Sequence, residues 1–96
     1  MIIEFSPKYT KHAIVRTQQR GIRKWVTEFI LINADMNKHV GKGCMSRFVS
    51  KKKLNKMLSI QVIQPKDADL VKGVVVIERD QTIQTVFHKK IRMRNR

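Results

Sequence analysis

Apolar residues in the first third of the chain recur at intervals of three and four, and this spacing predicts two helices. Ser6 followed by Pro7 is typical of an N-cap and a first helical position, so we expect the first helix to run from there to about Arg20. Gly21 is placed to end this helix in a left-handed cap, with Ile22 folding back onto it. The predicted core face of this helix consists of Ile14, Gln18 and Ile22.

A second helix is predicted over residues 23–34 and is the strongest core element of the chain. Its start is unusual, because Arg23 and Lys24 place positive charge where the helix dipole favours negative charge, at a cost of a few tenths of a kcal/mol each, roughly. Both an anion-binding spot and two solvated side chains fit this pattern. The residues that follow the helical spacing are Ile22, Trp25, Val26, Phe29, Ile30 and Asn33.

The middle of the chain mixes turn residues with short regular segments. Residues 37–43 contain two glycines and are expected to form a turn, and the alternation in residues 44–50 predicts a strand. A short basic helix is expected over residues 51–58. Pro65 and the aspartates that follow it favour a loop over residues 60–69.

The last third of the chain predicts a β-hairpin. Residues 71–78 form a β-branched run that is typical of a strand buried on both faces. Asp80 and Gln81 are expected to make a tight turn, and residues 82–88 to return as the partner strand.

This order of elements indicates an α+β domain with helices packed on one face of an antiparallel sheet. We expect a single domain over residues 1–88, followed by a basic tail over residues 89–96.

The charge of the chain points to an anionic partner. Its 96 residues include 21 Lys and Arg against 7 Asp and Glu, a formal net charge of +14. Nucleic acid is the expected partner, because neutralising phosphates releases counterions, and a membrane surface is the second option. With no recognisable leader, no apolar run near the ~20 residues of a membrane span, and Cys44 as the single cysteine, we expect a cytoplasmic protein.

His12, Arg16 and Arg20 are spaced four residues apart, so a helix places them along one face. Like charges at this spacing repel by a few tenths of a kcal/mol per pair, roughly, so the line favours an anionic ligand. The histidine at its head is able to move a proton near neutral pH.

No metal or cofactor is expected, because the three histidines are far apart in sequence and no metal-ligand, phosphate-loop or nucleophile-elbow motif occurs. Acid–base chemistry on RNA remains, since RNA supplies its own 2′-hydroxyl nucleophile. His12 and His88 are the candidate proton carriers, Arg16, Arg20 and Arg47 the candidate charge stabilisers, and Thr85 a candidate ligand for a phosphate oxygen or the 2′-hydroxyl.

Each candidate has a structural alternative. Arg47 is equally compatible with a sheet edge, and His88 with a frayed strand end. On a regular strand Thr85 and His88 point to opposite faces, so they share a site only if the strand twists or bulges. The remaining basic residues form a solvated charged surface or an RNA-contacting one: Arg23, Lys24, Lys51, Lys52 and Lys53.

The segment His12-Ala13-x-x-Arg16-x-x-x-Arg20-Gly21-Ile22 resembles the opening of a bacterial and phage family of small proteins, long described as a domain of unknown function and grouped with RelE/ParE-like toxins. Thr85-Val86-Phe87 resembles the end of the final hairpin of that family. Members usually have a small polar residue after Arg-Gly-Ile, where this chain has Arg23.

The resemblance implies a RelE-like, or microbial ribonuclease-like, fold with two N-terminal helices on a curved antiparallel sheet. It also implies metal-independent RNA cleavage by His12, Arg16 and Arg20, with Thr85 as a weaker match. RNA, free or on the ribosome, and an acidic antitoxin are the implied partners. Two alternatives stay open: a nucleic-acid-binding protein without catalysis, and a toxin that binds a protein target.

Overall fold

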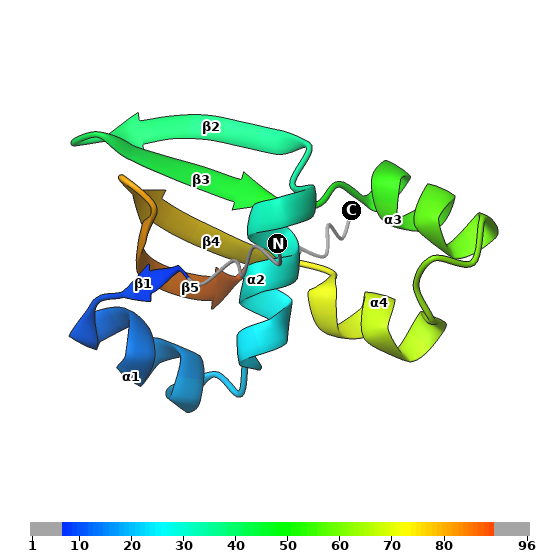
Figure 1. Ribbon diagram of the computed structural model, residues 1–96, viewed down its shortest axis with the longest axis horizontal. Helices are drawn as coiled ribbons and strands as arrows, with labels where there is room; N and C mark the ends of the chain where they lie inside the picture. The colour runs from blue at the N-terminus through cyan, green and yellow to red at the C-terminus, as the bar shows by residue number, and fades with distance from the viewer. Residues whose placement is uncertain (1–6, 90–96) are drawn as a thin grey trace, which may run out of the picture.

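Residues 7–89, which the computed structural model describes, form an α+β fold with four helices and five strands. The strands lie in the order β1-β5-β4-β3-β2 in one open sheet (Figure 1). Their bounds are Lys8–Tyr9 (β1), Met36–Gly41 (β2), Cys44–Phe48 (β3), Val74–Arg79 (β4) and Thr82–His88 (β5). The helices span Lys11–Gln19 (α1), Lys24–Asn33 (α2), Lys51–Ser59 (α3) and Pro65–Val71 (α4).

The α+β class is confirmed, but two parts of the prediction are wrong. The sheet is mixed, because β1 pairs in parallel with β5 while the other neighbours are antiparallel. The resemblance implies two N-terminal helices only, whereas α3, the predicted basic helix, and α4, which was not predicted, lie between β3 and β4.

Helix α1 begins later than its sequence pattern predicts. Its N-cap is Thr10, whose hydroxyl oxygen accepts a hydrogen bond from the Ala13 N–H at 3.0 Å and whose O–H donates to the Gln84 carbonyl at 3.1 Å. Pro7 precedes β1 and lies outside the helix, and Ser6 lies outside the described residues. Thr10 is the N-cap instead of Ser6 because its side chain also bonds to β5, a contact that is distant in sequence.

The predicted end of α1 is confirmed. Gly21 adopts a φ of +64°, and the N–H groups of Gly21 and Ile22 donate to the carbonyls of Gln18 and Thr17. These two bonds form a Schellman cap, which needs a left-handed residue and therefore favours glycine.

The core face of α1 differs from the predicted one. Ala13 is fully buried, whereas the side chain of Ile14 is 45% exposed and Gln18 is exposed. Ile22 is buried, as predicted. An alanine at the contact lets the helix backbone lie close to its neighbours, so the small side chain, and not the large one, faces inward.

Helix α2 is confirmed, with Val26 and Ile30 at the centre of the core. Arg23 is its N-cap residue and makes no side-chain capping bond, so this helix begins without a side-chain cap. Trp25 remains 36% exposed.

The region predicted as a turn over residues 37–43 is the strand β2 and its hairpin connection to β3. Every residue of β2 is exposed, so no burial alternation marks the strand in the sequence. The turn itself is shorter, with Gly41, Lys42 and Gly43 all at positive φ.

The region predicted as a loop over residues 60–69 contains the start of α4. Pro65 occupies the first turn of this helix, where its missing N–H costs nothing, and Asp67 complements the helix dipole there. The predicted basic helix is confirmed as α3, capped by Ser50, and the Asp80-Gln81 turn is confirmed with both residues at positive φ.

The four helices share one core, in which α1 packs against β5, α2 lies over β3 and β4, α4 packs on α2, and α3 packs on α4 (Figure 1). The sheet contributes Val74, Val76, Ile83 and Val86 to this core. The intervening Val75 is also buried, but it points to the opposite face and lies outside this core. Strand β4 is therefore buried on both faces, as its β-branched run predicts. Among residues 7–89 no helix is long and apolar enough to cross a bilayer.

Candidate functional site

Helix α1 lies along the outer edge of β5. Within residues 7–89, strand β1 pairs with two residues of β5, Thr82 and Ile83, and the residues that cap α1 supply further hydrogen bonds to that edge. The Thr10 N–H donates to the Ile83 carbonyl at 3.0 Å, and Nη1 of Arg20 donates to the Val86 carbonyl at 2.8 Å. The residues that cap the two ends of α1 are therefore both hydrogen-bonded to β5.

A pocket of about 630 Å³ lies between α1 and β5. It brings together five of the six residues predicted to be catalytic, and adds one aromatic residue. Its lining consists of His12, Arg16, Arg20, Thr85, Phe87 and His88.

The pocket is lined by two arginines and two histidines, and none of the lining residues in the described part of the chain is acidic. Nε of Arg16 donates to Nε2 of His12 at 3.4 Å, and its Nη1 donates to the Gln19 amide oxygen at 3.3 Å. Arg20 donates to a backbone carbonyl. Both guanidinium groups are thus held by neutral partners, which orient their charges without cancelling them.

Thr85 and His88 reach the same pocket although they stand on opposite faces of β5. The ladder to β4 pairs Thr85 with Ile77 and His88 with the core residue Val74. A register shift next to Gln84 bulges the strand before Thr85, not between the two residues. They meet because the pocket lies along the strand edge beside α1, which side chains from either face can border.

Phe87 is the pocket residue that the sequence analysis missed as a site residue. Its position two residues after Thr85 places both side chains on one strand face, and this spacing was available in the sequence. Phe87 is half-buried and offers an aromatic surface beside the cationic groups.

Arg47 does not line the pocket. Its Nε and Nη2 bond to one oxygen of Glu78 at 2.8 and 2.7 Å, and its Nη1 donates to the Asn37 side-chain oxygen at 2.7 Å. The other oxygen of Glu78 accepts the Gln81 N–H at 2.9 Å. This network ties β2 and β3 to the β4–β5 turn, and the charge of Arg47 is paired within it.

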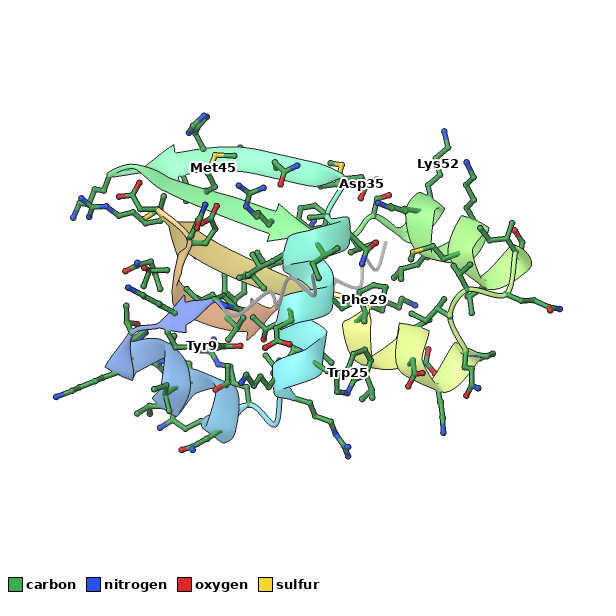
Figure 2. All side chains as sticks on the ribbon, viewed as in Figure 1. Tyr9, Trp25, Phe29, Asp35, Met45 and Lys52 are labelled. Carbon is green, nitrogen blue, oxygen red and sulfur yellow. The ribbon has the colours of Figure 1, made fainter. Side chains whose placement is uncertain are left out.

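The predicted nucleic-acid-binding residues separate into two regions. Arg23 and Lys24 lie at the start of α2. Nζ of Lys24 is 3.9 Å from Oε2 of Glu28, one turn further along the helix. Lys51 and Lys52 are exposed on α3, and Figure 2 shows Lys52 extending away from the body of the molecule. In Figure 1, α3 lies at the opposite end of the molecule from α1.

Lys53 contacts the end of α2 and so holds the start of α3 in place. Its Nζ donates to the Asn33 carbonyl at 2.5 Å, at the end of α2. Asp35 accepts the N–H and the O–H of Ser50 at 2.7 and 2.6 Å. Burial opposes the ionisation of Asp35, but the bonds from Ser50 and the charge of Lys53 outweigh it and lower the pKa of this carboxyl.

A second, smaller pocket of about 480 Å³ lies between α2 and the segment before α4. Trp25 and Phe29 meet edge to face on this side of α2, with ring centroids 6.3 Å apart (Figure 2). Lys66 and Asp67 both border it, so it lacks the uniform charge of the first pocket. Among residues 7–89 no group of three or more His, Cys, Asp or Glu residues is placed to hold a metal ion.

The fold and the pocket define an α+β protein with a cationic, histidine-containing pocket at the edge of a mixed sheet. No protein-family model, curated protein or solved structure matches this chain.

Proposed function

We propose that this protein is a toxin-like ribonuclease that cleaves RNA without a metal ion, using the pocket between α1 and β5. The observation that carries the proposal is the meeting of two imidazoles, two guanidinium groups and a hydroxyl in one pocket, where no residue within 7–89 adds an acidic side chain to the lining. These residues come from segments more than 60 positions apart in the chain, so their meeting is not a consequence of local sequence.

The proposed reaction uses the 2′-hydroxyl of RNA as nucleophile. One of His12 and His88 takes the 2′-hydroxyl proton while the 2′-oxygen attacks phosphorus. The bond from phosphorus to the 5′-oxygen breaks, and the other histidine gives that oxygen a proton. The products are a 2′,3′-cyclic phosphate and a free 5′-hydroxyl.

The arginines stabilise the charge that develops on the phosphate oxygens during this step. Arg16 and Arg20 each retain donors beyond those used within the protein, because a guanidinium carries five N–H groups. Thr85 supplies a hydroxyl to a phosphate oxygen or to the 2′-hydroxyl. Groups that are already oriented before the substrate binds stabilise a transition state more effectively than mobile ones.

A RelE-like fold is part of the proposal. Two features support it: α1 and α2 precede the antiparallel strands β2 to β5, with α1 along the edge of β5 and α2 on the sheet, and the last two strands form a hairpin that borders the pocket. The parallel strand β1 and the helices α3 and α4 are additions to the arrangement that the family resemblance implies. RNA is the proposed substrate, and an acidic antitoxin is the proposed protein partner.

The test is cleavage of RNA by the purified protein in the presence of EDTA. We expect His12→Ala and His88→Ala each to lower kcat/KM by about 10²- to 10⁴-fold, as loss of a general acid or base does. Arg16→Ala is expected to cost about 10²- to 10³-fold, as loss of a charge-stabilising donor does. His39→Ala is the matched control, because His39 is exposed on β2 and lies outside the pocket.

Equal cleavage by wild type and both histidine variants contradicts the proposed roles. RNA that is bound tightly but never cut points instead to a nucleic-acid-binding protein, and affinity then falls steeply with salt without depending on His12. Toxicity to host cells that survives loss of cleavage points to a protein target.

A further inference from the structure

The face of the sheet opposite α2 carries aromatic and basic side chains that the proposed reaction does not use. Helix α2 packs on β3 and β4, and its Val26 and Ile30 share one core with Val76 and Val86 of the sheet. Val75 points the other way, and its partner across the ladder is Phe87 of the pocket. The pocket is therefore the border of a second surface, which we call the Val75 face.

Strand register places a second aromatic ring on the Val75 face. Ser46 of β3 pairs with Ile77, which pairs with Thr85, so these three side chains share that face. Phe48 is two residues beyond Ser46 and therefore lies on the same face, one row nearer to Val75. With one strand between them, Phe48 and Phe87 are separated by roughly 10 Å, twice the strand spacing.

The charges on the Val75 face are basic. Nζ of Lys89 lies 5.1 Å from the centroid of the Phe48 ring, a cation–π contact. Lys38 pairs with Ser46 and so stands on this face at the outer strand β2. Arg16 and Arg20 border the other end, beside Phe87.

We propose that the Val75 face binds single-stranded RNA that leaves the pocket, with one base stacked on Phe87 and a neighbouring base on Phe48. As the base stacks, Lys89 leaves its position over the Phe48 ring and pairs with the phosphate between the two bases. Half-buried aromatic rings on a sheet stack bases well, and flanking cations hold the backbone. The inference takes RNA as ligand from the proposed function but does not require cleavage.

The spacing of the two rings selects single strands. Bases in a duplex strand are stacked about 3.4 Å apart and are paired along one edge. Two bases on rings roughly 10 Å apart must be splayed, which only an unpaired strand allows. The face therefore excludes double-stranded RNA, while a surface that acts by charge alone binds both.

The test measures binding of the full chain to labelled RNA with 2′-O-methyl groups, which lacks the nucleophile and is not cleaved. We expect Phe48→Leu to weaken binding of a six-nucleotide single strand by about 5- to 100-fold, the loss of one stacked base. Binding of a dinucleotide, which fills only the pocket, is expected to stay within twofold. Phe48→Trp is expected to bind at least as tightly as wild type.

Trp25→Leu is the matched control, since it removes an exposed aromatic side chain from the other pocket. Thermal unfolding of each variant shows whether Phe48→Leu is folded, and retained affinity in Phe48→Trp separates stacking from damage to the sheet. Unchanged six-nucleotide binding by Phe48→Leu, or equal binding of a duplex of the same length, overturns the inference.

This experiment separates the inference from the proposed function. Phe48-dependent binding of single strands by a protein that cuts no RNA leaves the inference standing and removes the ribonuclease. Cleavage that depends on His12 and is indifferent to Phe48, on substrates of every length, leaves the ribonuclease standing and removes the inference.

Discussion

Arg47 shows how a single residue acquires a role from a partner that is distant in sequence. Alternation along β3 predicts the face on which Arg47 lies, but it contains no information about Glu78, which is 31 residues away. The structure pairs the two charges and adds Asn37 and the Gln81 N–H to the same network. Arg47, a candidate charge stabiliser in the sequence, therefore links neighbouring strands in the structure.

We predict that Arg47→Ala destabilises the fold by about 1.5 to 3 kcal/mol, because it leaves the Glu78 carboxylate, only 8% exposed, without its charged partner. Urea unfolding measures this loss. Arg79→Ala is the control, since Arg79 is exposed on the same sheet. A folded Arg47→Ala protein of unchanged stability that has lost RNA cleavage would instead place Arg47 in the chemistry.

At the scale of elements, the sequence predicts well where local patterns are strong. The end of α1 at Gly21 and the last hairpin follow from glycine, turn and β-branched patterns, and α2 follows from the helical spacing of its apolar residues. The predictions are wrong where a residue fits two structures, where a strand has no buried side chain, or where an element depends on a contact that is distant in sequence. Pro65 starts a helix as readily as it stops one, β2 buries no residue, and the cap of α1 depends on a carbonyl of β5.

We predict that Thr10→Ala costs about 1 to 2.5 kcal/mol of folding stability, because it removes both the helix cap and the bond to the Gln84 carbonyl. Thr17→Ala is the matched control in the same helix, where the hydroxyl bonds only to the Ile14 carbonyl in an exposed position. Its expected cost is below about 0.5 kcal/mol. Equal losses in the two unfolding experiments contradict the role assigned to Thr10.

For the molecule as a whole, charge predicts the kind of ligand but not its location. Among the described residues, one cationic group lines the pocket beside α1 and another lies on α3, and these two helices are at opposite ends of the molecule (Figure 1). Helical spacing predicts the line of His12, Arg16 and Arg20. Its alignment with Thr85 and His88 could not be predicted, because it depends on how α1 docks on the edge of β5.

The separation of the two cationic regions predicts a length-dependent effect of salt. With a six-nucleotide RNA, Lys51→Ala combined with Lys52→Ala is expected to leave the slope of log affinity against log salt unchanged. With a long single strand, the same change is expected to reduce the slope by about 0.7 per lysine. Titration at several salt concentrations measures both slopes. A reduced slope with the short RNA would show that α3 and the pocket share one binding surface.

The hydrogen bonds between α1 and β5 also determine when the pocket can form during translation. Thr10 and Gln84 are 74 positions apart, so α1 leaves the ribosome long before its docking strand exists. Closing so long a loop is entropically costly and comes late in folding. A nascent chain therefore carries His12, Arg16 and Arg20 on an undocked helix, and the pocket remains unassembled beside the translating RNA until β5 has emerged.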